Sequence, residues 1–206
     1  MAWQDHVPDD IAELYEIYDY KHAAAILASE LPEEWDDLVF TLRRFRFSTE
    51  DVRSPGGNES NIPKHFSRLL RPRGWVEKQL HAKLVVDDEE IHHDTHKVDY
   101  LKGRVAFDLE WNSKDQTFDR DLYAFRAFFE YNRISVGVLV TRSNDLDAWF
   151  RSLGEYVDKN GQTRTFMSKY GASTTHMNKL LPRLHAGRSG GCPVLVLGIK
   201  RELVHD

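Results

Sequence analysis

The segment HKVDYLKGRVAFDLEWNSK (residues 96–114) predicts a β-hairpin that carries acidic side chains on one face. The odd-numbered residues from Val105 to Trp111 are all apolar, whereas Asp108 and Glu110 stand between them. Successive side chains of a strand point to opposite faces, so this alternation predicts a strand with one face on a core. Asp108 and Glu110 therefore share the other face of the same strand.

A third acid precedes this strand, and a short turn brings it close. If Lys102-Gly103 forms a two-residue hairpin turn, Asp99 lies opposite Ala106 and diagonal to Asp108, within roughly 7–8 Å. Three carboxylates at that spacing repel one another unless a cation lies between them, and oxygen-rich sites of this kind suit Mg²⁺. The alternative at this point is a solvent-facing acidic edge strand, which has the same local pattern.

The composition bounds the class of protein. The chain has 206 residues, of which 41% are apolar and 12% aromatic, so we expect residues 1–206 to form a single domain with its own core. The sequence contains no run of about 18 apolar residues, so we expect no membrane span. The start MAWQDHVPDD lacks the pattern of a signal peptide. A single cysteine, Cys192, fits a reducing compartment, so we expect a cytoplasmic protein in which Cys192 is structural.

The net charge of −5 argues mildly against a nucleic-acid partner but does not exclude one, because the basic residues are clustered. The remaining pattern predicts helices that flank a mixed sheet, and therefore the α/β class. Further strands are predicted at 14–20, 75–86, 134–141 and 193–199, a loop at 54–61, and helices at 21–30, 32–44, 63–73, 118–131, 146–153 and 173–184.

Several segments together resemble a known family. They are YEIYDYKHAAAIL (15–27) with the following LPEEW helix, the Gly74-Trp75 segment, the core VDYLKGRVAFDLEW, then DLYAFRAFF, ISVGVLV and PVLVLGI. The chain resembles type II restriction endonucleases of the BglII/BstYI group, within the PD-(D/E)xK nuclease superfamily. This resemblance implies a restriction-endonuclease-like sheet and a Mg²⁺-dependent homodimer that cleaves double-stranded DNA at a short palindromic site. It also implies a cognate DNA methyltransferase in the same system.

The resemblance assigns roles to the three acids. Asp99 matches the first metal-binding aspartate, and Asp108 takes a position that usually holds Glu. Glu110 stands where the group has Gln and many superfamily members have Lys, which gives an acidic version similar to BamHI-like enzymes. Asp99 and Asp108 are thus expected to hold one or two Mg²⁺ ions. Glu110 then completes the metal shell or acts as the general base, but it cannot supply a lysine's positive charge.

Two nearby charged residues are candidate accessories. Glu77 follows Trp75 and is either an extra acid of the site or a solvent-facing strand residue. Lys97 lies opposite Asp108 in the predicted register, where it is either a structural ion-pair partner or a replacement for the missing catalytic lysine. We favour the ion-pair interpretation for Lys97.

DNA recognition requires side chains that reach base edges with hydrogen bonds. The resemblance implies that the loop after the acidic strand contributes to this, which makes Asn112, Ser113 and Lys114 candidates, with an ordinary polar loop as the alternative. A second set, Ser173, Thr174 and Asn178, contacts bases or caps the following helix. Expected phosphate contacts, each with an ordinary surface charge as the alternative, are Arg43, Lys64, Arg68, Arg71, Arg183 and Arg188.

Other functions are weighed against this one. His92, His93 and His96 have no spacing typical of a closed zinc site, and the glycines at 54–61 lack the lysine of a phosphate-binding loop. Two alternatives stay open. One is a repair or structure-specific nuclease with the same fold, and the other is a non-catalytic DNA-binding relative.

Overall fold

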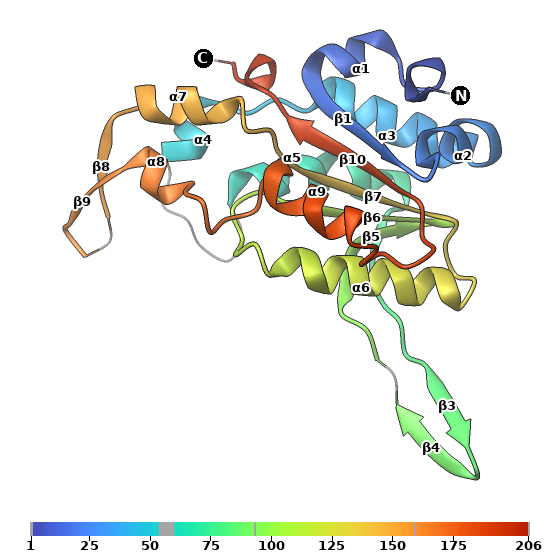
Figure 1. Ribbon diagram of the computed structural model, residues 1–206. Coiled ribbons are helices and arrows are strands. Elements are labelled where there is room, and N and C mark those ends of the chain that lie inside the picture. The colour runs from blue at the N-terminus through green and yellow to red at the C-terminus, as the bar shows by residue number, and fades with distance from the viewer. Residues whose placement is uncertain (1, 54–59, 93, 159, 206) are drawn as a thin grey trace.

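The computed structural model describes residues 2–53, 60–92, 94–158 and 160–205, and a six-stranded mixed sheet lies at its centre (Figure 1). The middle strand β7 runs parallel to both of its neighbours, and the outer strands pair antiparallel. This arrangement confirms the predicted α/β class. In sheet order the strands are β1 (Tyr15–Tyr20), β10 (Val194–Ile199), β7 (Val136–Arg142), β6 (Val105–Glu110), β5 (Lys97–Lys102) and β2 (Val76–Gln79).

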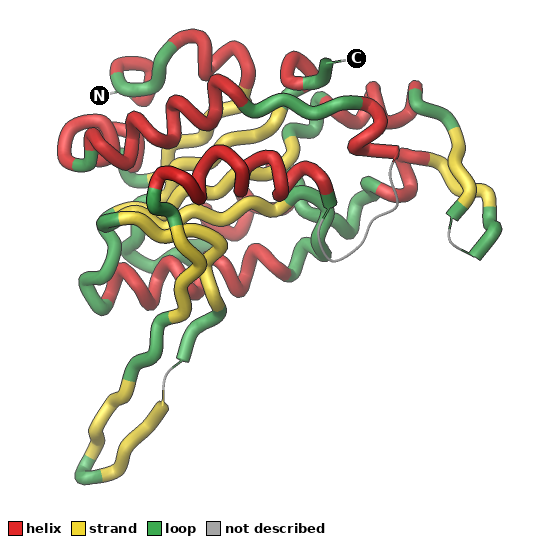
Figure 2. Tube along the Cα trace, turned by 180° about the vertical axis from the view of Figure 1, so that it is seen from behind, coloured by secondary structure: helices red, strands yellow, loops and turns green. Residues whose placement is uncertain are grey.

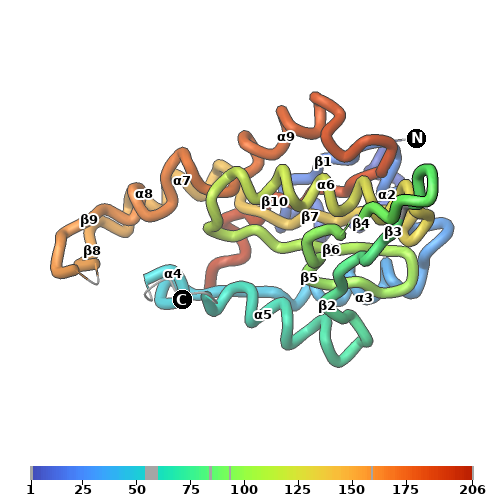
Figure 3. Tube along the Cα trace, turned by 90° about the horizontal axis from the view of Figure 1, so that it is seen from below, coloured from blue at the N-terminus to red at the C-terminus, as the bar shows by residue number. Residues whose placement is uncertain are grey.

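Helices cover both faces of this sheet, so the molecule has three layers (Figure 3). Each face has its own apolar cluster, because the strands present alternate side chains to the two layers. One face carries α1 (Asp9–Leu14), α2 (Ala23–Glu30), α3 (Pro32–Arg44) and α5 (Asn61–Leu70); the other carries α6 (Thr117–Glu130) and α9 (Met177–His185). The short helices are η1 (Trp3–Asp5), α4 (Thr49–Arg53), η2 (Arg71–Arg73), α7 (Leu146–Ser152), α8 (Phe166–Lys169) and η3 (Arg201–Leu203).

The central strands are buried on both faces, which explains their continuous apolar sequences. Every residue of β7 and of β10 is buried. Gly137 in β7 lets α6 approach closely, since a Cβ at this position would clash with the ring of Phe125. Helix α6 is therefore held tightly against the strands that carry the acids.

Two hairpins lie outside the central sheet and project from the body (Figures 1 and 2). The longer one consists of β3 (Lys83–Val86) and β4 (Glu89–His92), and the shorter one of β8 (Glu155–Val157) and β9 (Thr163–Thr165). The prediction of a continuous strand at 75–86 is wrong. The chain leaves the sheet after β2, where Leu80 N–H donates to Thr95 Oγ1 at 3.2 Å, and continues into the projecting arm.

Other element boundaries also differ from the predictions. Leu14 ends a helix, so the first strand begins at Tyr15, and the helix predicted from Ser173 begins only at Met177. Residues 54–59 of the predicted loop and His93 lie outside the described residues. None of the helices that the structure describes has the length and apolar character needed to cross a bilayer.

Candidate active site

The acidic hairpin forms as predicted, but its turn lies one residue further along the chain. Lys102 pairs with Val105, so the turn residues are Gly103 and Arg104. Gly103 adopts a φ of 50°, a left-handed conformation that glycine accommodates readily. The predicted pairing of Leu101 with Arg104 is therefore wrong.

The corrected register brings the acids closer together than predicted. Ala106 pairs with Leu101 instead of Asp99, which brings Asp99 level with Asp108. The backbone N–H of Asp99 donates to Asp108 Oδ1 at 2.6 Å, and the N–H of Leu109 donates to Asp99 Oδ2 at 3.3 Å. Each carboxylate thus accepts a hydrogen bond from the backbone of the opposite strand.

An irregularity in β5 coincides with Asp99. Leu101 pairs with Val76 and Val98 with Lys78, so three residue steps on β5 face two on β2. The extra residue falls at Asp99–Tyr100, in the manner of a β-bulge. Bulges re-aim side chains and are common beside active sites. The sequence pattern of alternating residues could not have shown this one.

Asp99 and Glu110 line a cleft of about 480 Å³ at this end of the sheet. Asp99 is exposed at its rim, whereas Asp108 is 3% exposed and Glu110 9% exposed. Asp99 is therefore accessible to solvent, whereas Asp108 and Glu110 lie in the protein interior. The other residues that line the cleft are Pro63, Ser67, Arg71, Glu77, Tyr100, Leu109 and Ser113.

Burial raises the pKa of all three carboxyl groups. For Asp108 the raised pKa comes first from burial and then from the charge of Asp99. Burial raises the pKa of Glu110 to about 7, although a hydrogen bond from Ser113 opposes the shift. Partial removal of the Asp99 carboxyl group from water also raises its pKa, although the residue lies at the rim and the hydrogen bond from Leu109 N–H opposes the shift. Ionisation of each of these three carboxyl groups is therefore less favourable than in water.

A fourth acid, Asp121 of α6, lies near enough to Asp108, Glu110 and Asp99 for their charges to raise its pKa. It is not among the acids that the sequence predicts for the site. Asp121 is 5% exposed, and its pKa is raised first by burial and next by the charge of Asp108. A signal existed in the sequence: Asp121 lies three residues after Phe118 and four before Phe125, on the apolar face of a predicted helix. The charge of the neighbouring Arg120 lowers the pKa of all four acids.

The two accessory candidates contact each other. Lys97 Nζ lies 2.7 Å from Glu77 Oε2, and both side chains are about half exposed. The predicted position of Lys97 opposite Asp108 is wrong, because the turn has shifted, but it does form an ion pair. Glu77 lines the cleft, and its charge raises the pKa of Asp99.

The two predicted DNA-binding segments lie side by side. Lys114 and Thr174 form an isolated antiparallel bridge, and Thr175 N–H donates to the Ser113 carbonyl at 2.9 Å. Lys114 and Ser173 are exposed and accessible to a ligand. Thr174, in contrast, accepts a hydrogen bond from Arg142 and so has a structural contact. Asn178 lies exposed in the first turn of α9 and not at its cap.

Arg142 is a structural residue that the sequence did not suggest. It is fully buried, and its Nε donates to the carbonyls of Trp111 at 2.8 Å and Thr175 at 3.1 Å. Its guanidinium also lies over the rings of Trp111 and Tyr170. Arg142 therefore connects the two candidate DNA-binding segments from within.

The six candidate phosphate contacts fall into two groups. Arg43 pairs with Asp10, while Arg183 and Arg188 both pair with Asp119. Within the described parts of the chain, Lys64, Arg68 and Arg71 form no ion pair with a carboxylate. Arg71 lines the cleft and lies 5.0 Å from the centre of the Tyr100 ring.

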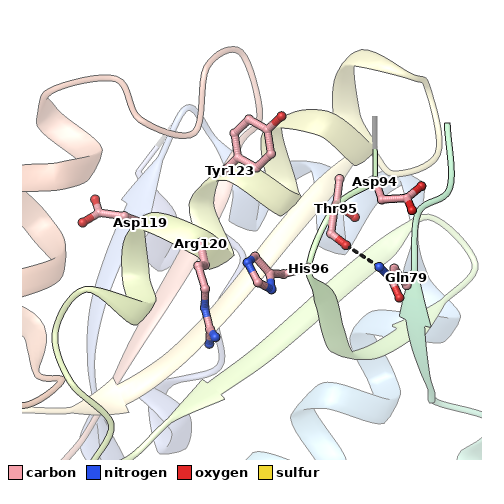
Figure 4. A pocket seen from close by; sticks show the side chains of 7 residues that line it. All are labelled: Gln79, Asp94, Thr95, His96, Asp119, Arg120 and Tyr123. Carbon is pink, nitrogen blue, oxygen red and sulfur yellow. Dashed lines mark hydrogen bonds between the residues drawn. The ribbon is translucent and has the colours of Figure 1, made fainter. Parts of the chain in front are cut away.

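A second pocket of about 600 Å³ lies between α6 and the segments around Gln79 and His96 (Figure 4). Arg120 and His96 face this pocket from opposite walls, and Tyr123 and Gln79 also line it. Arg120 is exposed, and no hydrogen bond or ion pair fixes its side chain among the described residues. It can therefore approach an anion beside the carboxylates.

The donor set at the acids fits a hard divalent cation. Asp108 Oδ2, Glu110 Oε2 and Asp121 Oδ2 are buried oxygens without a hydrogen-bond partner in the described structure. Such acceptors are costly to bury unless a cation or a proton satisfies them. Among the described residues, no group of three acid, histidine or cysteine side chains, His92 and His96 included, is placed to hold a metal ion by itself. Mg²⁺ does not require one, because it retains several waters and binds through one or two carboxylates.

Comparison with protein families places these observations in context. The family model described as restriction endonuclease BglII/BglIII matches residues 15–199, which is nearly the whole chain and includes Asp99, Asp108, Glu110 and Asp121. No curated protein matches the chain.

Proposed function

The chain belongs to the restriction endonuclease BglII/BglIII family, whose members are type II site-specific deoxyribonucleases, and we propose that its reaction requires Mg²⁺ and a short palindromic site. One observation carries the proposal. Asp99 and Asp108 lie level on adjacent strands, Glu110 follows two residues along β6, and Asp108 Oδ2 and Glu110 Oε2 are buried without hydrogen-bond partners in the described structure. Such oxygens are the ligands expected at a site for a hard cation.

In the proposed site, Asp99 and Asp108 hold the cation and Glu110 faces the attacking water. A bound divalent cation neutralises the phosphate charge and favours departure of the leaving oxygen. Glu110 Oε2 accepts a proton from water, whose oxygen bonds to phosphorus as the bond to the 3′ oxygen breaks, and the departing 3′ oxygen takes a proton from a solvent water. The products are a 5′-phosphate and a 3′-hydroxyl. In the metal-free protein, burial raises the pKa of Glu110 to about 7, which supports a role in proton transfer.

Positive charge at the site comes from the helix and the cleft wall in this proposal. Arg120 of α6 supplies the charge that a lysine at position 110 provides in many superfamily members. Arg71 on the wall of the cleft contacts the scissile strand, and Lys97 orients Glu77 as a further acid. Whether one or two cations bind depends on how many of these acids take part.

DNA recognition is assigned to the paired segments. Asn112, Ser113, Lys114, Ser173 and Asn178 reach base edges, while Thr174 contributes through its contact with Arg142. A palindromic site needs two active centres, so we propose a homodimer. We further propose a cytoplasmic enzyme that is accompanied by a methyltransferase to protect the host DNA.

The test is digestion of a long DNA with Mg²⁺, followed by sequencing of the ends. We expect wild type and the surface control Asp36→Asn to cut at discrete sites. Asp99→Asn and Asp108→Asn should each reduce the rate by at least about 100-fold, since loss of one transition-state charge contact typically costs this much.

The pattern of ends separates the alternatives. Scattered cuts would favour a repair or structure-specific nuclease, and binding without cuts in every divalent metal would favour a non-catalytic relative. Equal cleavage by wild type and both acid variants would remove these residues from the mechanism.

A further inference from the structure

Asp121 is buried in a place where a structural acid is not expected. It lies on the inner face of α6 beside Phe118, Leu122 and Phe125, which pack against the sheet. Only 5% of the residue is exposed, and its Oδ2 has no hydrogen-bond partner in the described structure. Burying a charge without a partner is costly, so natural cores normally avoid it.

Asp37 shows what a structural buried acid looks like in this same chain. Asp37 is 7% exposed and accepts hydrogen bonds from Arg73 at 3.0 Å, Trp75 at 3.1 Å and Lys102 at 2.8 Å. Asp121 has no such set of donors. Its strongest charged neighbour is another carboxylate, Asp108, followed by Glu110. Its surroundings therefore favour a cation and not a permanent ion pair.

Asp108 and Asp121, two of the three acids with orphaned oxygens, belong to different elements that pack together. Ala106, two residues before Asp108 on the same face of β6, belongs to the apolar cluster between the sheet and α6. Phe118 and Leu122, which flank Asp121, belong to the same cluster. By strand alternation and helix position, both acids therefore belong to this layer. We propose that Asp121 is a fourth acid of the cation site and that it contributes its charge and Oδ2 to the hydrated ion held by Asp108. Asp121 then acts through the ion and its waters as a positioning residue, in the way that outer partners orient metal ligands.

This inference rests on the proposed function, because it assumes that a divalent cation binds at Asp99 and Asp108. It also explains why helix α6 must lie so close to β7, at Gly137. Any outward displacement of the helix would carry Asp121 away from Asp108.

The experiment measures binding of Mn²⁺ to the full chain without DNA, by calorimetry and by the shift of the unfolding temperature. We compare wild type with Asp121→Asn, with Asp37→Asn as a matched buried aspartate and with Asp99→Asn. Without metal, Asp121→Asn should unfold at the same temperature as wild type or higher, because one repelling charge is gone. Its Mn²⁺ dissociation constant should rise by about 10–100-fold, the range typical for loss of an outer-shell partner.

The controls separate the possible outcomes. Asp37→Asn should lower the unfolding temperature without metal and leave the Mn²⁺ affinity unchanged. If Asp121→Asn behaves like Asp37→Asn, Asp121 is a structural acid and the inference is overturned. If Asp99→Asn also retains full Mn²⁺ affinity, the fault lies in the proposed metal site itself and both proposals fail. Unchanged Mn²⁺ affinity in Asp121→Asn alone removes only the fourth acid.

Discussion

Glu110 departs from the polar or basic residue that the superfamily places two positions after the second acid, and its surroundings define what it does. It is 9% exposed, and burial raises its pKa from 4.5 to about 7. Between those two values the folded chain holds a proton that the unfolded chain releases. Proton binding therefore stabilises the folded state, and this contribution is lost as the pH rises through about 7.

The first prediction concerns the stability of the metal-free protein. Its unfolding temperature should rise as the pH falls from about 8 to about 5, because Glu110 and the neighbouring acids with raised pKa values become neutral. Glu110→Gln should show a smaller rise over the same range. A wild-type stability that falls steadily from pH 8 to pH 5 would contradict the electrostatic description of the site.

The second prediction concerns competition between protons and the cation. Below pH 7, the apparent Mg²⁺ affinity should fall by up to about tenfold per pH unit, because metal binding requires the deprotonated carboxylates. Arg120→Met removes a charge that lowers the pKa of Glu110, so its profile should move to higher pH. Arg126→Met, on the outer face of the same helix, should leave it unchanged. Coincident profiles for wild type and Arg120→Met would exclude the role assigned to Arg120.

At the scale of elements, Arg142 connects the loop after β6 to the segment before α9. It donates to carbonyls of both, and burial lowers its pKa to about 10, so it remains charged at neutral pH. We expect Arg142→Met to destabilise the fold by about 3 kcal/mol, since each unpaired buried carbonyl costs roughly 1–3 kcal/mol. Discrimination between the cognate site and sites with one changed base should also weaken.

Arg142→Lys and Arg151→Met control this prediction. Arg142→Lys retains one charged donor and should recover part of the discrimination, whereas Arg151 is exposed on α7 and its substitution should have no effect. If Arg142→Met and wild type show the same ratio of cleavage rates at the cognate site and at sites with one changed base, Arg142 contributes to stability alone.

The sequence predicts an element well where the pattern of apolar residues or the turn motif is strong, and poorly where it is weak. The alternation around Asp108 correctly predicts β6 and the separation of its two faces, because burial of one face determines it. The turn was misplaced because Lys-Gly is a weak hairpin signal, and the one-residue difference determines whether Asp99 faces Ala106 or Asp108. Contacts between distant segments, such as Arg142 with Trp111, leave no periodic pattern in the sequence.

At the scale of the whole molecule, the family match over residues 15–199 confirms the resemblance inferred from short segments, and the mixed sheet confirms the fold class. The β3–β4 arm was missed, because its residues continue the strand pattern of β2. The arm exposes Val85 and Ile91, and an acidic turn at Asp87 and Asp88 joins its strands. An acidic arm of this kind does not favour contact with phosphates.

The fourth prediction follows from the independence of the arm. Replacing residues 83–92 by two glycines should change the unfolding temperature by less than about 2 °C, because β3 and β4 pair with each other outside the central sheet and none of the arm's described side chains belongs to the buried core. Scanning calorimetry of the shortened chain measures this directly. A loss of more than about 5 °C would mean that the arm is part of the cooperative fold.

The central claim is that acids on β5 and β6 bind a divalent cation where DNA is cleaved. Anomalous diffraction from Mn²⁺-soaked crystals of the wild-type protein tests it most directly. The account predicts a peak within about 2–2.5 Å of carboxylate oxygens of Asp99 and Asp108, a distance typical of hard divalent cations. A peak at other residues, or none at an Mn²⁺ concentration that supports cleavage, would contradict it.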